Sequence, residues 1–419
     1  MAPTFAFYGD DFTGSIDVLL QLSRAGWSSR LYLDHALVDS SELSRFPVDA
    51  VGIAGIARSL SGDELDREVV TAFEALGSLA PAFVQYKTCS TADSSPTVGS
   101  LGRVLEIGKS FFGVQPIPIL FAQPDFGRFT AFAHHFAREN GTIYRLDRQP
   151  TMANHPSTPM TESDLTIHLS KQTDIPIGSI TVDTYTSVNR VAKTLGSSNC
   201  AGVVMDAVSG SDLEIVGNAI VDSTVISPRF VMGSGGMTLA IASAIGKKVA
   251  QPVATKLQNR GMPMLAVSGS QSAQTQRQIA AAIDLGWKHF ELPWKAQQIP
   301  PVTTQAIMSL RSGNSVILTM EKASFADNPV VALTNLLATA IQDVINAGAC
   351  YRVAICGGDT SSRIMRLLGA SSLEIAANPS DNLTICKALS NNPRIDGLEI
   401  ALKGGQVGPN EYFEIIRKA

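Results

Sequence analysis

Short apolar runs alternate with longer amphipathic segments along nearly the whole chain. Apolar runs of ~4–8 residues that are bounded by glycine or polar residues are typical of strands buried in parallel sheets. Such runs lie at 4–9, 28–34, 50–55, 82–87, 117–123, 201–207, 229–235, 262–269, 315–320, 352–358 and 398–405. Helical patterns lie between many of them, for example at 211–222 and 328–348. This alternation predicts an α/β protein in which mainly parallel sheets are flanked by helices.

Two stretches interrupt the alternation. Residues 251–263, QPVATKLQNRGMP, separate two strand-rich halves, and they predict an N-terminal domain of residues 1–250 and a C-terminal domain of residues 251–419. A chain of 419 residues is long enough for two or three such domains. Residues 144–168 are polar and rich in proline, which predicts a long ordered loop of the kind that often carries function.

Composition excludes several classes of protein. A formal net charge of −4 gives no electrostatic reason to bind nucleic acid or an anionic membrane. No uninterrupted apolar run approaches the ~20 residues that span a bilayer, and the start MAPTFAFYGDD lacks a signal-peptide pattern. The five cysteines contain no C-x-x-C pair, so neither a disulfide framework nor a zinc knuckle is indicated. We therefore expect a globular protein of the reducing cytoplasm.

The stretch FAFYGDDFTGSIDVLLQLSRAG places Asp10 and Asp11 directly after an apolar strand and directly before an apolar helix. Adjacent carboxylates repel each other, and burying them requires a cation, hydrogen-bond donors or a helix N-terminus. Two interpretations stay open. The pair forms a ligand-binding or catalytic site, or it consists of turn and cap residues in a helix that Thr13 or Ser15 could equally cap.

Glycine-rich turns follow four of the predicted strands. Glycine lets the backbone approach a ligand closely, and the N–H groups of a following helix can bind an anion. Each turn alone is more typical of a tight connection, but together they indicate phosphate binding. The turns are VMGSGG at 231–236, VSGSQS at 267–272, CGGDTSS at 356–362 and LKGGQVG at 402–408.

Named nucleotide motifs do not account for these turns. The stretch GRVLEIGKS at 102–110 imitates a Walker motif, but five residues separate its glycines and the pattern around them is helical. No G-x-G-x-x-G follows a strand with an acidic residue about 20 positions later. The Walker and dinucleotide interpretations are therefore rejected.

Seven motifs follow one another along nearly the whole chain: GDDFTGSID, GIAGIARSLS, YKTCST, FGRFTAFAHH, VSGSQS, GGDTSSRIM and LKGGQVG. This ordered set resembles the four-carbon acid sugar kinase family, which opens with D-D-[FL]-T-G-A-x-D and has the further motifs in the same order. The resemblance implies an ATP-dependent kinase of a short sugar acid such as threonate, erythronate or a 3-oxo relative. It also implies an acid-binding N-terminal domain, an ATP-binding C-terminal domain and an active site in the interdomain cleft.

The resemblance and the residue chemistry together give a set of candidate site residues. Asp10 or Asp11 would accept the proton of the attacking hydroxyl or hold substrate hydroxyls, and the assignment between them stays open. Basic side chains would bind the carboxylate or the transferring phosphate. The candidates for the acid are Asp10, Asp11, Thr13, Arg58, Lys87, Thr88, Cys89, Ser90 and Arg128, and those for ATP are Ser268, Ser270, Gly357, Gly358, Asp359, Thr360, Gly404 and Gly405.

The sequence departs from the family where substrate is expected to bind. Better-known members read K-x-D-S-T-L-R-G, whereas this chain reads KTCSTADSSP, with Cys89 in place of an aspartate. The loop HPSTPM is a further difference from the threonate and erythronate kinases. The pattern is closer to a subgroup that includes kinases of 3-oxo-isoapionate, a branched acid.

Several other predictions concern cofactors and rival functions. Mg²⁺ is implied by ATP chemistry, with Asp359 as a candidate ligand or ribose contact. The adjacent His134 and His135 are expected on different sides of a helix and so make no metal site, while His155 is expected to form a loop hydrogen bond. A phosphatase of the haloacid dehalogenase type is excluded because D-x-D-x-T is absent here. A non-catalytic sugar-acid sensor remains the alternative, and a homodimer is an assembly to test.

Overall fold

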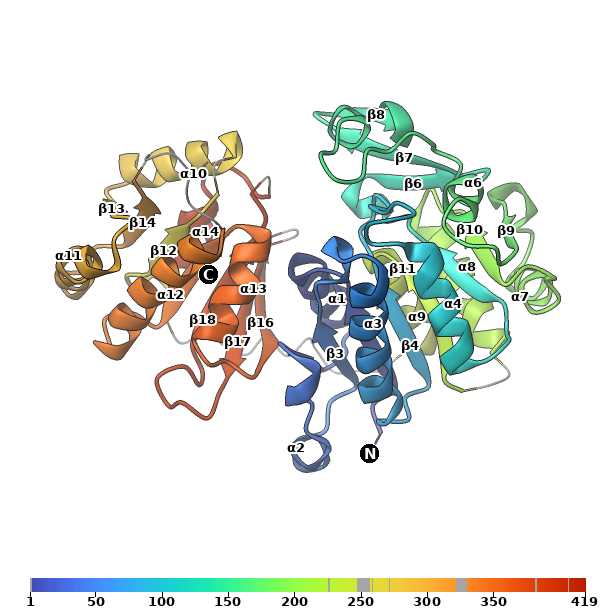
Figure 1. The fold of residues 1–419 in the computed structure, drawn as a ribbon, viewed down its shortest axis with the longest axis horizontal. Helices are drawn as coiled ribbons and strands as arrows, with labels where there is room; N and C mark the ends of the chain where they lie inside the picture. Colours follow the sequence, from blue (N-terminus) through green and yellow to red (C-terminus); the bar gives the residue numbers. More distant parts are fainter. Residues whose placement is uncertain are drawn as a thin grey trace. The chain divides into compact units, whose positions relative to one another are not determined.

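The structure, a computed structural model, describes residues 2–224, 227–246, 257, 259–270, 272–321, 330–380, 383–405 and 407–419, without the side chains of residues 330, 358–360 and 362. The chain divides into two compact units (Figure 1). Unit 1 comprises Met1–Ser29 and Asp34–Pro252, and unit 2 comprises Arg30–Leu33 and Val253–Ala419. Most of the expected boundary segment 251–263 lies outside the described residues.

A parallel sheet forms the centre of unit 1. Its described strands lie in the order β3-β1-β4-β11-β5-β10-β9, and the neighbouring strands pair in parallel. The carboxyl ends of these strands therefore meet at one edge. The strands are β1 (Phe5–Gly9), β3 (Ala50–Ala54), β4 (Phe83–Lys87), β5 (Ile117–Leu120), β9 (Ile177–Ile180), β10 (Gly202–Met205) and β11 (Arg229–Gly233).

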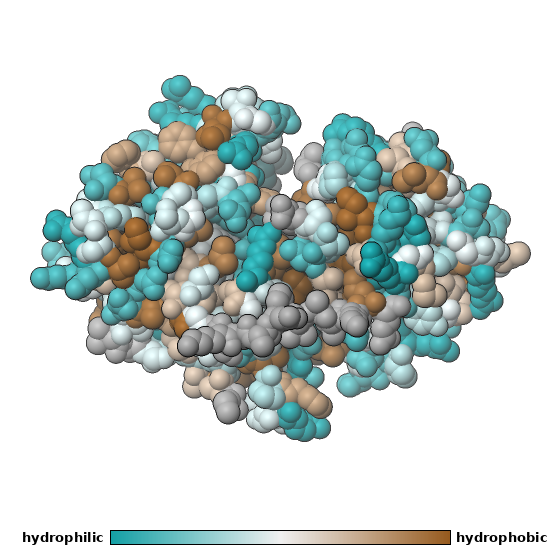
Figure 2. Space-filling view, turned by 180° about the vertical axis from the view of Figure 1, so that it is seen from behind, coloured by the Kyte–Doolittle hydropathy of each residue, from teal (hydrophilic) through white to brown (hydrophobic). Residues whose placement is uncertain are grey.

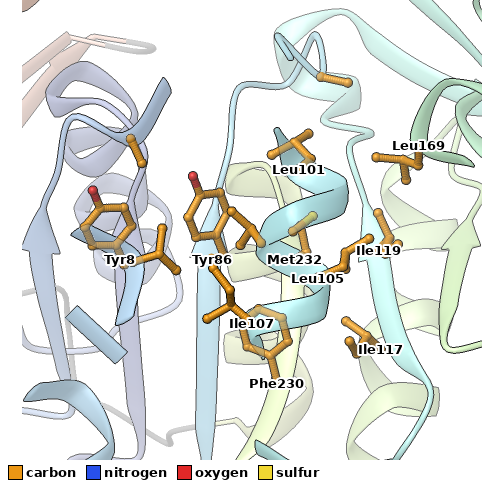
Figure 3. Packing of buried hydrophobic residues seen from close by; sticks show 14 of the residues in the cluster. Tyr8, Tyr86, Leu101, Leu105, Ile107, Ile117, Ile119, Leu169, Phe230 and Met232 are labelled. Carbon is orange, nitrogen blue, oxygen red and sulfur yellow. The ribbon is translucent and has the colours of Figure 1, made fainter. Parts of the chain in front are cut away.

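Helices cover both faces of this sheet, as alternating strand residues require. Side chains of α3, α4 and α6 pack with Tyr8, Tyr86 and Ile119 in one core, part of which is drawn in Figure 3. On the other face, α9 packs against α1 and α8, and α8 packs against α7. The helices are α1 (Phe12–Arg24), α2 (Ser40–Arg45), α3 (Gly62–Gly77), α4 (Leu101–Phe112), α5 (Pro150–Ala153), α6 (Leu165–Ser170), α7 (Val188–Gly196), α8 (Gly210–Asp222) and α9 (Gly235–Ile245).

A small antiparallel sheet is inserted between β5 and β9. It consists of β6 (Arg128–Ala131), β7 (His134–Glu139) and β8 (Thr142–Arg145), joined by two-residue turns. His134 and His135 were expected in a helix, and that prediction is wrong, because they begin strand β7. The residues around His134 and His135 have no clear helical period, and antiparallel pairing with β6 places them in a strand. The expected loop at 144–168 contains α5 and the start of α6.

Unit 2 has a mixed sheet. Its described strands lie in the order β13-β14-β12-β15-β18-β17-β16-β2, where the pairings from β13 to β18 are parallel and those from β18 to β2 are antiparallel. Segment 30–33 of the N-terminal half thus completes this sheet. The strands are β2 (Ser29–Tyr32), β12 (Leu265–Ser268), β13 (Lys288–Leu292), β14 (Val316–Met320), β15 (Arg352–Cys356), β16 (Ser372–Ser380), β17 (Leu383–Leu389) and β18 (Glu399–Lys403).

The helices of unit 2 also lie on two faces. Residues of α10 and α14 share one core with Ala266, Ala354 and Ala401 of the central strands. Helices α11, α12 and α13 pack against one another, with α12 on β12 and α13 on β15 and β18. The helices are α10 (Ala273–Asp284), α11 (Ile299–Arg311), α12 (Val330–Asn346), α13 (Gly358–Leu367) and α14 (Tyr412–Lys418).

The predicted α/β class with two sheet-centred domains is confirmed. Every apolar run that was predicted as a strand contains one, and 102–110 lies in helix α4 as expected. Figure 2 shows small hydrophobic areas interspersed with hydrophilic ones on the face it presents. Within the described residues, no helix is long and apolar enough to cross a membrane.

Candidate functional site

The carboxylate pair lies between β1 and α1, at the carboxyl edge of the unit 1 sheet. Asp11 caps α1, because its Oδ1 accepts a hydrogen bond from the Gly14 N–H at 2.8 Å. Thr13 and Ser15, which were candidate caps, lie inside the helix, and the Ser15 hydroxyl donates to the Asp11 carbonyl oxygen. The side chain of Asp11 is 22% exposed and that of Asp10 is 2% exposed. Asp11 therefore faces solvent, whereas Asp10 does not.

Arg58 forms ion pairs with both carboxylates. It follows β3 in a short 3-10 helix, and its Nε and Nη2 donate to Asp10 at 3.2 and 2.7 Å. Its Nη1 and Nη2 donate to Asp11 at 3.0 and 2.9 Å. Burial raises the pKa of Asp10, and the positive charge of Arg58 partly offsets this rise. Burial opposes the charge on Arg58, but the two carboxylates hold its pKa well above its usual value. The three side chains of Asp10, Asp11 and Arg58 thus hydrogen-bond to one another.

The end of β4 supplies the next candidates. The Lys87 Nζ donates to the Thr88 carbonyl oxygen at 2.8 Å and lies 3.8 Å from Asp17 Oδ2. Cys89 Sγ lies 2.9 Å from the Thr91 hydroxyl, which donates to Asp93. Burial raises the pKa of the Cys89 thiol, so this side chain is a neutral neighbour for a ligand.

Two hydroxyls beside these residues are buried without a hydrogen-bond partner in the structure, those of Tyr86 and Thr88. Tyr86 stacks on Tyr8 with ring centroids 5.6 Å apart, and Figure 3 shows both hydroxyls pointing the same way. The Tyr8 hydroxyl donates to Glu68, but that of Tyr86 has no acceptor among the described residues. Burial raises the pKa of Tyr86, followed by the nearby charge of Asp10. An unpaired buried hydroxyl near the carboxylate pair is suited to a polar ligand.

Arg128 differs from Arg58 in having no carboxylate partner among the described residues. It begins β6, its Nη1 donates to the Phe126 carbonyl oxygen at 2.8 Å, and its guanidinium lies over the Phe126 ring. Its Nε is buried and makes no hydrogen bond. Burial lowers the pKa of Arg128, and the charge of Asp93 partly opposes this shift. Arg58 and Lys87 each have a carboxylate within 4 Å, so Arg128 is the candidate cation without a carboxylate partner in the described part of unit 1.

In unit 2, three of the predicted glycine turns lie side by side. Strands β12, β15 and β18 pair in parallel so that Ser268 is level with Cys356, and Cys356 is level with Lys403. The Gly269 N–H donates to the Cys356 carbonyl oxygen, and the Gly357 N–H donates to that of Lys403. The turns that follow these strands therefore share one stretch of the carboxyl edge.

Hydroxyl groups link the first and third turns. The Thr275 hydroxyl donates to the Gly405 carbonyl oxygen at 2.9 Å, and the Ser272 hydroxyl donates to the same oxygen. Ser272 caps α10, and its backbone N–H donates to the Ser270 hydroxyl oxygen at 3.3 Å. A Cβ on Gly405 would lie 2.7 Å from the Ser270 hydroxyl oxygen, so a side chain at position 405 would require Ser270 to move.

The second turn leads directly into α13. Gly357 is its N-cap with φ of 128°, a conformation that favours glycine, and Gly358 is its first residue. Asp359 and Thr360 lie in the first turn of the helix, but their side chains lie outside the described part of the structure. The backbone N–H groups of this helix start are available to an anion in the manner of other helix N-termini.

Two charged residues that lie beside the candidates were missed from the candidate set, Lys403 in unit 2 and Asp17 in unit 1. Lys403 is 2% exposed, and its Nζ donates to the Thr275 hydroxyl and the Gly404 carbonyl oxygen, both at 3.0 Å. Burial lowers its pKa. Asp17 pairs with Lys87 and lies against Gly235, where a Cβ would approach its Oδ2 to 2.3 Å. Both positions carry charge inside apolar patterns, which is the signal that could have identified them.

The remaining polar side chains make no metal site. Among the described residues, no group of three or more His, Cys, Asp or Glu could hold a metal ion. His155 Nδ1 accepts hydrogen bonds from the backbone N–H and hydroxyl of Thr158, within the loop as expected. Burial lowers the pKa of His135 and His168 to about 4, so both are neutral near pH 7.

Comparison with family models separates the same two regions. A model described as a sugar-binding N-terminal domain matches residues 5–241, and one described as a nucleotide-binding C-terminal domain matches residues 265–413. The carboxylate pair and Arg128 lie in the first match, and the three adjacent glycine turns lie in the second.

Curated relatives match over nearly the full chain. A 3-oxo-isoapionate kinase of Paraburkholderia graminis is 32% identical, covering 99% of this chain and 94% of that protein. A 3-oxo-tetronate kinase of Pseudomonas savastanoi pv. phaseolicola is 26% identical, covering 98% and 96%.

Solved structures share the fold. A Salmonella typhimurium LT2 protein, provisionally described as a tRNA synthase, superposes with a TM-score of 0.82 at 21% identity over 99% of both chains. A Haemophilus influenzae protein from a domain family of unknown function superposes with a TM-score of 0.74, also at 21% identity, over 98% of both chains. At these identities the likeness shows the fold alone.

Proposed function

The chain belongs to the four-carbon acid sugar kinase family, with a sugar-binding N-terminal and a nucleotide-binding C-terminal domain, and we propose that this sugar-acid kinase uses ATP to phosphorylate 3-oxo-isoapionate or a closely related short 3-oxo acid. The observation that carries the acceptor side is the contrast between Arg58, which is fully engaged, and Arg128, which is not. The 3-oxo-isoapionate kinase at 32% identity favours that substrate.

Arg128 is our candidate for binding the substrate carboxylate. Its buried Nε has no partner, and an unpaired buried donor is costly unless a ligand satisfies it. An arginine–carboxylate contact can use two parallel N–H donors, which fixes both the position and the orientation of the acid. Cys89, close to this guanidinium, offers a small uncharged contact to the carbon skeleton.

Asp11 is our candidate for the group that contacts the attacking hydroxyl. Its side chain is the more exposed member of the pair, while Asp10 is buried and holds Arg58. Phosphoryl transfer requires a carboxylate that accepts the hydroxyl proton and a fixed line of attack. The cap bond from Gly14 and the two bonds from Arg58 fix the Asp11 carboxylate in place. Asp10 is then a positioning residue.

The ATP phosphates are proposed to bind at the three turns of unit 2. Glycine amides, the Ser268 and Ser270 hydroxyls and the start of α13 provide donors, and Lys403 provides a buried positive charge beneath Gly404. Asp359 is the only acidic residue of these turns in the sequence. Mg²⁺ is proposed to arrive with ATP, where phosphate oxygens are its main ligands. Transfer requires the bound hydroxyl and the γ-phosphate to meet, so the family's interdomain active site remains our proposal.

The direct experiment is a substrate panel. Purified protein is mixed with ATP, Mg²⁺ and one of 3-oxo-isoapionate, the 3-oxo-tetronates, threonate or erythronate, and phosphorylated product is followed by ³¹P NMR. We expect the highest kcat/KM with a 3-oxo acid. Tight binding of one acid without phosphorylation of any acid would favour the sensor alternative and contradict the kinase.

Arg128→Gln provides the site-specific version of this experiment. We expect the KM for the acid to rise about 30-fold or more, as for loss of a charge-assisted contact, with an unchanged KM for ATP. Arg138→Gln is the matched control, because that guanidinium lies over the Phe129 ring of the same small sheet and has no carboxylate role in this proposal. Equal effects of both changes would contradict a specific role for Arg128.

A further inference from the structure

The two hairpin turns of the small sheet in unit 1 differ in a way that points to function. Phe132 and Ala133 join β6 to β7, and their φ values are 53° and 63°. Asn140 and Gly141 join β7 to β8, with φ values of 48° and 83°. Two-residue hairpins of this type need positive φ at both positions, which Asn-Gly adopts readily and Phe-Ala does not. The first turn therefore has an unfavourable sequence for its conformation.

A buried carboxylate holds the unfavourable turn in place. Asp206, which follows β10, is 0% exposed and accepts hydrogen bonds from the N–H groups of Phe132 at 2.5 Å and Ala133 at 3.0 Å. It also accepts one from the Val182 N–H at 3.1 Å. Phe132 itself is 59% exposed, so burial of its ring does not compensate for the backbone conformation. Among the described residues, the hydrogen bonds to Asp206 hold both N–H groups of the turn, and the Leu165 N–H donates to the Ala133 carbonyl oxygen at 3.0 Å.

The turn is connected to the candidate substrate residues by direct contacts. Thr130 and His135 face each other across the hairpin, with the Thr130 hydroxyl 2.9 Å from His135 Nδ1. His135 is neutral, so its Nε2 donates to the Ser90 carbonyl oxygen at 2.8 Å while Nδ1 accepts from Thr130. Ser90 belongs to the loop after β4, and β6 begins with Arg128. One hairpin thus supports both sides of the proposed acid site.

We propose that Asp206 is a positioning residue of the kinase: by holding the Phe132–Ala133 turn, it places His135 against Ser90 and so fixes the loop of residues 88–94 for the acid. The inference rests on the proposed function for its kinetic consequence. Its structural consequence, order in that loop, stands independently. A strained segment held by its surroundings is a common feature of binding sites.

The test compares Asp206→Asn with a variant in which the turn no longer needs Asp206. We expect Asp206→Asn to raise the KM for 3-oxo-isoapionate about tenfold or more, since a displacement of about 1 Å can cost 10²-fold, with the KM for ATP unchanged. Hydrogen exchange of peptides covering residues 88–94 should quicken in the same variant. Adding Phe132→Asn and Ala133→Gly should reverse both effects, because Asn-Gly adopts the turn without the carboxylate.

The second hairpin supplies the control. Replacing Asn140 by Phe and Gly141 by Ala puts the same unfavourable pair into a turn of the same sheet, and we expect residues 88–94 to keep their exchange rates. Unchanged exchange in Asp206→Asn, or no recovery in the triple variant, overturns the proposal, including where Asp206→Asn fails to fold and the triple variant does too. If the wild-type protein phosphorylates no acid in the panel, the proposed function fails while the exchange comparison still decides this inference.

Discussion

The candidate sites of the two units present opposite kinds of surface to a ligand. In unit 1 the site consists of charged side chains that hold one another, with Arg58 between Asp10 and Asp11. In unit 2 it consists mainly of backbone, where Gly357, Gly404 and Gly405 have no side chain and the Lys403 Nζ donates to the Gly404 carbonyl oxygen. Both lie at the carboxyl edge of parallel strands. Under the proposed function, the carboxyl edge of a parallel sheet binds a small acid by side-chain chemistry in unit 1 and a phosphate chain by backbone geometry in unit 2.

The largest effect should come from Asp11→Asn. Asparagine keeps the helix cap but cannot accept a proton, so we expect kcat to fall about 10²–10⁴-fold, the usual contribution of a general base. ATP binding, measured by calorimetry, should stay unchanged because it belongs to unit 2. Asp39→Asn is the matched control, since Asp39 also caps a helix, at an exposed position in unit 1. A kcat within twofold of wild type would show that Asp11 is only a cap.

Gly357→Ala should disrupt the proposed phosphate site of unit 2, which is formed mainly by backbone groups. At a φ of 128° alanine is strained, so the start of α13 must shift and its N–H groups lose their alignment. We expect the KM for ATP to rise about 30- to 100-fold, while the affinity for the acid stays the same. Gly369→Ala controls for strain alone, because Gly369 has a φ of 78° and open space around it. A similar change in that control would contradict the assignment.

Lys403→Met sharpens the comparison by removing the buried charge from the backbone site. Methionine nearly preserves the volume, so we expect the fold to persist and the KM for ATP to rise about tenfold, through loss of charge-assisted hydrogen bonding. Lys387→Met on the exposed side of β17 is the control. If the two variants bind ATP equally well in a filter-binding assay, Lys403 serves packing alone.

Acid should destabilise unit 1 before unit 2. Burial lowers the pKa of His135 and His168 to about 4 from an ordinary 6.5. Below pH 6.5 the unfolded chain gains these protons and the folded chain does not, so stability present above that pH is lost as pH falls toward 4. We expect a loss of roughly 1–2 kcal/mol per histidine between pH 7 and pH 5.

Hydrogen exchange resolved by unit is the appropriate measurement. His168→Gln should reduce the pH dependence of unit 1 by about half, because one of two contributions is removed. His289→Gln in unit 2 is the control. That residue is exposed, and its partial burial lowers the pKa of the imidazole less than full burial lowers those of His135 and His168. Equal acid sensitivity of the two units would contradict the expectation.

The sequence by itself determined the α/β class, most of the parallel strands, the division into two strand-rich halves and the family. Apolar runs such as AVGIAG and RVAICGG became strands because residues buried on both faces of a parallel sheet must be continuously apolar. Strands β6 to β9, β13, β16 and β17 escaped detection. Most of them are partly exposed, and a partly exposed strand without strict alternation leaves little periodic signal.

Only the tertiary structure decided which candidates are engaged and which are available. Arg58 and Arg128 look alike in the sequence, yet one binds two carboxylates and the other keeps a buried donor unpaired. Asp206 and Lys403 gained roles through residues far away in the chain, Phe132 for one and Thr275 for the other. Local pattern records burial and periodicity, but pairing between distant side chains depends on strand register and on how the chain returns to the same sheet edge.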